Sequence, residues 1–127
     1  MRPQVQAWQS EDLLQVTYYC QDPNLLEEID AIFAGAVHTH LRIAHEQTAA
    51  GTGKDAALRY AAAYYQIPLE ATAAIGDSGN DIAMLREAGI GAAMGNATEE
   101  CRSAADFVTG RIEEDGFYDA VCRLLGQ

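Results

Sequence analysis

The chain has 127 residues, enough for one domain that buries its own core without disulfides or a structural metal. Hydrophobic residues make up 49% of it and charged residues 21%, which excludes a disordered tail as the main interpretation. The net charge of −11 repels nucleic-acid phosphates and anionic lipid surfaces, so we expect neither nucleic-acid nor membrane partners.

The cysteines and the first residues indicate where the protein works. Cys20, Cys101 and Cys122 are odd in number and widely spaced, which predicts free thiols rather than a disulfide framework or a zinc site. The first residues lack the apolar segment of a secretory signal. No apolar run approaches the roughly 20 residues of a membrane helix. We therefore expect a cytoplasmic protein.

The first third of the chain predicts a strand, a helix and a second strand. Residues 13–20 are rich in Val, Thr and Tyr and indicate a strand. Asp22-Pro23-Asn24 then ends this strand and caps a helix over 25–34, whose apolar residues recur at helical spacing. A second strand is expected over 38–45. The whole segment has about the size of a βαβ crossover.

The remaining chain predicts alternating helices and strands. A flexible junction at 49–53 is the expected domain boundary. Helices are expected at 54–66, 81–88, 98–105 and 115–125, and strands at 71–75, 91–94 and 107–109. Thr98 should cap the third of these helices, and Gly89 should end the second in a left-handed conformation. This alternation predicts an α/β fold with a mostly parallel sheet flanked by helices.

One loop carries most of the chemistry. The segment GDSGND, residues 76–81, follows an apolar strand, and ligands of α/β sheets bind beyond the carboxyl ends of strands. Asp77 offers the carboxylate oxygen that Mg²⁺ prefers, and Asn80 offers an amide N–H for a phosphate oxygen. Asp81 can orient its neighbours or stabilise the following helix dipole. Taken alone, the same residues also suit an acidic helix-capping turn.

Lys54 is the candidate cation. At the start of a predicted helix, its ammonium is a point charge suited to a phosphoryl group. Taken alone, such a residue is more often a solvated surface lysine. Together with the loop at 76–81 it predicts a single pocket on which Lys54 and Asp77 converge.

These motifs, in this order, resemble a known family. Lys54, a helix, a strand, GDSGND, a helix, Gly95-Asn96-Ala97 and Ala105-Asp106 resemble the C-terminal half of Cof-type phosphatases of the haloacid dehalogenase (HAD) superfamily. GDSGND and the LQVTYY segment at 14–19 are also similar to sucrose-phosphate phosphatases and related enzymes. The resemblance implies a partial HAD-like Rossmannoid core at 49–127 and a βαβ remnant of the cap domain at 1–48.

The resemblance also implies an activity and roles for the residues. It implies Mg²⁺-dependent hydrolysis of a phosphomonoester, with a sugar phosphate as the expected substrate. Lys54 would bind the substrate phosphate and take part in catalysis, and Asn80 would contact the same phosphate. Asp77 would bind the metal, and Asp81, the second acid of the motif, would serve the metal site and orient the catalytic groups.

One family motif is missing from this chain. The family begins with an Asp-x-Asp motif whose first aspartate is the nucleophile, and no Asp-x-Asp occurs here. We therefore expect the isolated chain to be inactive. The strand at 71–75 should also have an unpaired edge, which favours a partner: a missing N-terminal half or a second copy. The alternative function is a non-catalytic HAD-like module for dimerisation or regulation.

Weaker signals support other sites less well. Gly51-Thr52-Gly53-Lys54 suggests a P-loop, but Asp55 stands where that motif needs Ser or Thr, which excludes it. Tyr60, Tyr64 and Tyr65 are expected in core or interface packing.

Three histidines lie in or beside the second predicted strand. In a regular strand His38 and His40 share one face and His45 lies on the other. Surface positions are favoured over a metal-binding pair, and a sugar-contacting role stays open.

Overall fold

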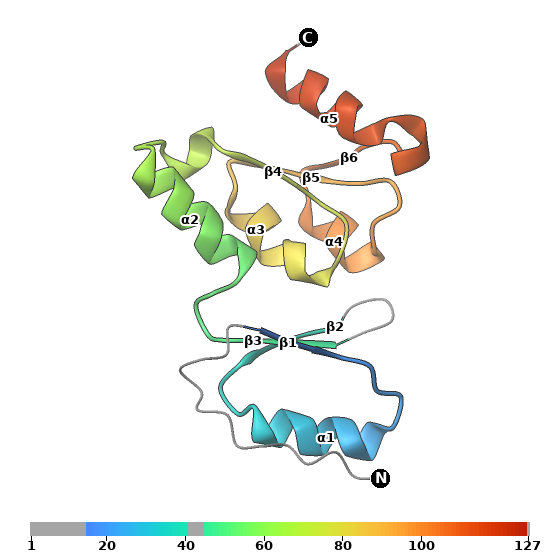
Figure 1. Cartoon of the computed structure of the whole chain (residues 1–127). Helices are drawn as coiled ribbons and strands as arrows, with labels where there is room; N and C mark the ends of the chain where they lie inside the picture. The colour runs from blue at the N-terminus through green and yellow to red at the C-terminus, as the bar shows by residue number, and fades with distance from the viewer. Residues whose placement is uncertain (1–14, 41–44, 127) are drawn as a thin grey trace.

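The computed structural model describes residues 15–40 and 45–126, which form two separate sheets (Figure 1). The first is a small antiparallel sheet in the order β1-β3-β2, with a helix, α1, beneath it. Its elements are β1 (Gln15–Tyr18), α1 (Pro23–Ile32), β2 (Val37–His40) and β3 (His45–Thr48).

The start of α1 follows from the local sequence, as predicted. The Asp22 carboxylate accepts a hydrogen bond from the Asn24 N–H at 3.0 Å and caps the helix. Pro23 occupies the first helical position, where its missing N–H costs no hydrogen bond.

The prediction of one strand over 38–45 is wrong. Two strands, β2 and β3, pair antiparallel instead, with His40 opposite His45. Each is only four residues long and largely polar, so the alternation of residue types does not show where the chain reverses. Because β1 and β2 both run antiparallel to β3, they are parallel to each other and form a strand–helix–strand unit with β3 inserted. Positions 13–14 and 41–44 of the predicted strands lie outside the described residues.

The second sheet is parallel, in the order β4-β5-β6, and helices flank it, which confirms the predicted α/β fold. Figure 1 shows α3 and α4 on one side of this sheet and α5 on the other. The strands are β4 (Ala73–Gly76), β5 (Ile90–Ala93) and β6 (Phe107–Val108). The helices are α2 (Lys54–Tyr64), α3 (Ile82–Glu87), α4 (Glu99–Ala104) and α5 (Gly116–Leu125). Thr98 caps α4 as predicted, accepting a hydrogen bond from the Cys101 N–H.

The core lies between the parallel sheet and α3 and α4. Its buried members are small or flexible side chains: Ala74, Leu85, Ala93, Met94, Ala97 and Cys101. Alanines on β4 and β5 let the helices approach the sheet closely, and Leu85 fills the space between them with only 1% of its surface exposed. The interior is thus small, and each large side chain in it matters.

Gly89 does not adopt the left-handed conformation that we predicted. Helix α3 ends at Glu87, and Ala88 is already extended, with φ −62° and ψ 151°. A Cβ on Gly89 would lie 2.1 Å from the Glu70 carbonyl oxygen. The glycine is required because the neighbouring backbone passes so close, which is a tertiary constraint and not a helix-ending signal.

Strand β4 is an edge of the parallel sheet: in the described chain it pairs with β5 alone.

Three tyrosines in and just after the last turns of α2, Tyr60, Tyr64 and Tyr65, are exposed. The prediction that they pack in the core is therefore wrong, and the prediction that they pack in an interface is not tested. No helix in the described residues is long and apolar enough to cross a membrane.

We predict that Leu85→Ala destabilises the fold by about 2–5 kcal/mol, because it leaves a cavity in a small core. Urea unfolding followed by circular dichroism measures this free energy. Leu125→Ala is the matched control, since Leu125 is 66% exposed and its loss should cost well under 1 kcal/mol. Equal losses in the two variants would contradict this description of the core.

Candidate active site

The loop after β4 is held against the sheet by backbone contacts. The Met94 N–H donates to the Gly76 carbonyl at 2.9 Å, and the Thr98 N–H donates to the Asp77 carbonyl at 3.0 Å. Gly76 has to be glycine, because a Cβ there would lie 2.4 Å from the Cβ of Asp81. The loop therefore sits beyond the carboxyl end of β4, where the sequence predicted it.

The Asp81 carboxylate is the centre of the loop. It is 3% exposed, and its Oδ2 accepts hydrogen bonds from the backbone N–H groups of Asp77, at 2.9 Å, and Ser78, at 3.1 Å. Its Oδ1 accepts a hydrogen bond from the Lys54 Nζ at 2.5 Å. One carboxylate thus closes the loop and binds the lysine of α2.

The pKa of Asp81 is lowered from its ordinary value. Burial is the largest single influence and by itself raises the pKa, but the hydrogen bond from Lys54 and those from the Asp77 and Ser78 N–H groups together outweigh it. Asp81 is therefore held as a carboxylate, the form that keeps the loop and Lys54 in place.

Asn80 lies beside this ion pair with a fixed orientation. Its Oδ1 accepts hydrogen bonds from Lys54 Nζ at 3.3 Å and from Ser78 Oγ at 2.8 Å. Its Nδ2 donates to the Glu46 carboxylate at 3.4 Å. The Asn80 amide oxygen therefore faces Lys54 and Ser78, and its amide nitrogen faces Glu46. Since this nitrogen carries two hydrogens, one N–H is left for a ligand.

The structure brings the side chains of Lys54, Asn80 and Asp81 together, and Asp77 joins them through its backbone. Lys54 contacts Asn80 and Asp81, whereas Asp77 reaches the same carboxylate through its backbone N–H. The Asp77 residue is exposed, and its side chain makes no hydrogen bond or ion pair within the described chain. Its carboxylate is thus available to a ligand.

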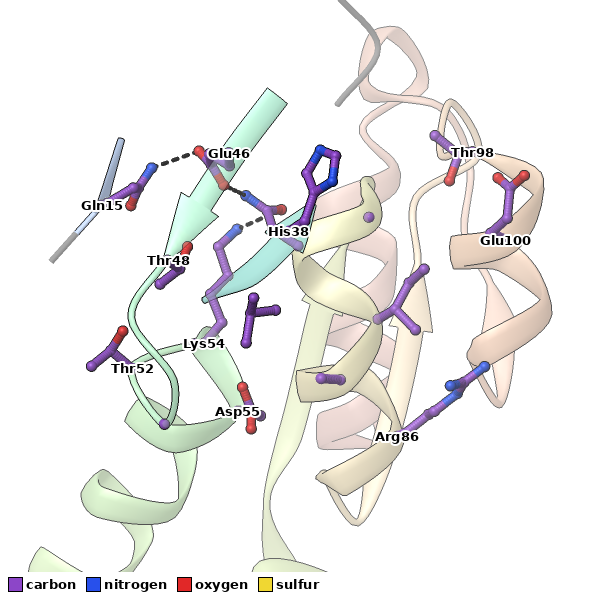
Figure 2. Close-up of a pocket in the computed structure, with 17 residues that line it drawn as sticks. Gln15, His38, Glu46, Thr48, Thr52, Lys54, Asp55, Arg86, Thr98 and Glu100 are labelled. Atoms are coloured by element: carbon purple, nitrogen blue, oxygen red, sulfur yellow. Dashed lines mark hydrogen bonds between the residues drawn. The ribbon is translucent and has the colours of Figure 1, made fainter. Parts of the chain in front are cut away.

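A cleft of about 770 Å³ lies between the small sheet and this loop. Figure 2 shows Lys54 reaching into it from α2, and Glu46, Gln15 and Thr48 facing it from the small sheet. Asn80 also lines the cleft, whereas the buried Asp81 and the exposed Asp77 are not among its lining residues. The cleft has the size of a small-molecule site, with Lys54 and Asn80 in its wall.

Glu46 is a site residue that the sequence analysis missed. It lies on β3 between the buried His45 and Gln47, and its carboxylate accepts hydrogen bonds from Gln15 at 2.6 Å and from Asn80. No signal in the sequence identifies it, because all four residues of β3 are polar and the period of two along a strand assigns faces only once the strand has been placed.

The histidines form a polar cluster against α1. His38 Nε2 lies 3.1 Å from His45 Nδ1, so the expectation that His45 faces away from His38 is wrong, because the two lie on paired strands. Asp30 of α1 lies 3.3 Å from His38 Nδ1 and accepts a hydrogen bond from Gln47 at 2.7 Å. These contacts join the helix to the sheet. The described residues contain no group of three His, Cys, Asp or Glu side chains placed to hold a metal, and the His40 side chain lies outside them.

Comparisons with known proteins identify the family of the chain. The model of the haloacid dehalogenase-like hydrolase family matches residues 6–121, and the chain belongs to this family. It is 50% identical over 72 residues to the phosphatase YwpJ of Bacillus subtilis, covering 57% of this chain and 25% of that protein. It is 43% identical over 76 residues to the 5-amino-6-(5-phospho-D-ribitylamino)uracil phosphatase YcsE of the same organism, covering 60% of this chain and 30% of that one.

A solved structure is similar as well. A sugar phosphatase of HAD subclass IIB matches with a TM-score of 0.77 at 34% identity, covering 89% of this chain and 43% of that chain. The chain thus spans less than half the length of each of these three proteins. The resemblance to phosphatases of this superfamily is confirmed.

We predict that the Asp81 carboxyl titrates below the ordinary value of about 3.9. Carbon-detected NMR of the carboxyl measures the midpoint directly, and a midpoint at or above 3.9 would contradict the described contacts. A carboxylate with a lowered folded pKa stabilises the fold above the unfolded pKa, and this contribution is lost as the pH falls through the folded pKa. Asp81→Asn should therefore cost about 1–3 kcal/mol at pH 7, and the cost should shrink below about pH 4.

Proposed function

We propose that this chain supplies the phosphate- and cation-binding half of a phosphomonoester hydrolase, with sugar phosphates as the substrate class. The observation that carries the proposal is Lys54 held against Asp81 and Asn80 at the wall of the cleft. A fixed ammonium and a free amide N–H suit the equatorial oxygens of a phosphoryl group. The phosphatase names of the relatives and the sugar phosphatase among the similar structures support the same class.

The charges of the site favour a divalent cation. Lys54 contributes one positive charge and Asp77 and Asp81 contribute two negative charges, so the three side chains together carry a net charge of −1. A phosphoryl dianion would be repelled by this balance unless a cation were added. Mg²⁺ suits the site, since it prefers carboxylate oxygens and often binds through one or two carboxylates together with substrate phosphate. When bound, it would supply the positive charge that phosphoryl transfer needs.

Each side chain then has a role that its contacts support. The carboxylate of the exposed Asp77, which makes no hydrogen bond within the described chain, offers the metal-binding group. Both oxygens of Asp81 already accept hydrogen bonds, which favours an orienting role over direct metal binding. Lys54 and Asn80 bind the phosphoryl group, and Lys54 stabilises its charge during transfer.

The nucleophile has to come from elsewhere. With no Asp-x-Asp in its sequence, the chain alone should bind phosphate but not hydrolyse an ester. We therefore propose that a separate segment or chain completes the site, and that residues 1–48 belong to a cap and residues 49–127 to the core. The cytoplasmic location and the absence of nucleic-acid and membrane partners stay predictions.

We predict that the isolated chain binds inorganic phosphate more tightly with Mg²⁺ than without it, as measured by isothermal titration calorimetry. Lys54→Ala should weaken phosphate binding at least about 10-fold, the effect of roughly one lost charge contact. Asp77→Ala should remove the Mg²⁺ dependence. Arg111→Ala is the control, because it removes an exposed positive charge that does not line the cleft. Unchanged phosphate binding in Lys54→Ala would refute the proposed site.

A second candidate function, dimerisation, is favoured by the open edge of β4 and by the exposed tyrosines of α2. We predict that a module of this kind dimerises at micromolar concentration in sedimentation experiments without phosphate. Tyr64→Ser, at a side chain that is 70% exposed, should then weaken the dimer without changing the unfolding free energy of the monomer, measured at a concentration below the dissociation constant. A chain that stays monomeric at all concentrations would argue against this function.

A further inference from the structure

We propose that Glu46 selects the substrates of this cleft: it admits phosphomonoesters whose remaining part is neutral or cationic and excludes those that carry a second anionic group. This inference rests on the proposed function, since it concerns the part of the substrate that lies beyond the phosphoryl group.

The position of Glu46 supports this role. Its carboxylate reaches from β3 of the small sheet to within 3.4 Å of the Asn80 amide nitrogen, next to the proposed phosphate site. Gln15 of β1 donates to its other oxygen at 2.6 Å and holds the side chain over the cleft. Figure 2 shows Gln15 joined to Glu46 by a hydrogen bond on the small-sheet side of the cleft.

Glu46 carries an uncompensated negative charge on the small-sheet side of the cleft, whereas Arg86 and Glu100, which also line the cleft, lie on α3 and α4. Two other charged side chains nearby already have partners: Lys54 pairs with Asp81, and Asp55 pairs with Arg59 at 2.9 Å. Glu46 makes no ion pair within the described chain, and the two side chains that donate hydrogen bonds to it, Gln15 and Asn80, are neutral amides. When the phosphoryl group of a ligand is bound at Lys54, the rest of the ligand therefore lies in the negative potential of the Glu46 carboxylate.

The chemistry of the surrounding wall is consistent with a polyhydroxylated ligand. Gln15 and Thr48 line the same side of the cleft as Glu46, which gives it amide and hydroxyl groups. The Glu46 carboxylate can only accept hydrogen bonds, so it suits hydroxyl and ammonium donors. A carboxylate or second phosphate at this place would face it without an intervening cation and would be repelled.

The test compares two ligands that differ at one end. Sorbitol 6-phosphate and 6-phosphogluconate share the phosphate and the hydroxyl chain, but one ends in a neutral hydroxymethyl group and the other in a carboxylate. Calorimetric titration of the full chain with Mg²⁺ gives both affinities, and inorganic phosphate gives the affinity of the phosphoryl site alone. The variants are Glu46→Gln and, as the matched control, Glu100→Gln, which removes the same charge from another part of the cleft wall.

The wild-type chain should prefer sorbitol 6-phosphate by about 10-fold, and Glu46→Gln should reduce this preference below about 3-fold while leaving inorganic phosphate binding within about 3-fold. Glu100→Gln should keep the preference. The inference is overturned if the wild type shows no preference, if Glu46→Gln keeps it in full, or if Glu100→Gln lowers it as much. If Lys54→Ala bound inorganic phosphate as tightly as the wild type, the proposed function itself would be refuted, and the selectivity with it.

Discussion

The buried carboxylate of Asp81 is the contact on which the site depends. It accepts hydrogen bonds from two backbone N–H groups of its own loop and from the ammonium of Lys54, which comes from a different helix. Hydrogen bonds to a charged group are worth about 1.5–3 kcal/mol each, more than those between neutral groups. The loop, the lysine and the end of β4 are therefore fixed relative to one another before any ligand binds, and this preorganisation is what a phosphoryl site requires.

The same contact bears on the proposed role of a divalent cation. Because Asp81 already neutralises Lys54, little positive charge is left for a phosphate, and the exposed Asp77 makes the balance negative. A metal-dependent phosphate site is consistent with this arrangement, whereas a site relying on lysine alone is not. The open edge of β4 indicates that the parallel sheet can accept a further strand next to the loop.

Features with a local cause could be predicted from the sequence, and features with a tertiary cause could not. Asp22-Pro23 and Thr98 start helices through contacts within three residues, so their caps were predicted correctly. The parallel order of β4, β5 and β6 followed from the alternation of elements. Gly89 was misinterpreted because its requirement comes from the backbone at Glu70, about twenty residues earlier.

The candidate site divides in the same way. The loop at 76–81 and Lys54 were found because the family motif fixes their order along the chain. Glu46 was not found, because its contact with Asn80 depends on the pairing of β2 with β3, and this pairing could not be predicted from two polar strands of four residues each. The contact between His38 and His45 was missed for the same reason.

Strand β3 serves two neighbours at once. His45 and Gln47 on one face join the polar cluster against α1, while Glu46 and Thr48 on the other face line the cleft. Exchanging a single cleft-facing side chain can thus alter ligand preference with little effect on the packing behind it. Inserting or deleting one residue upstream within the hairpin would instead turn the strand over, placing the carboxylate in the interior and a histidine over the ligand. Substitution, and not a change of length, is the route by which this segment can diversify.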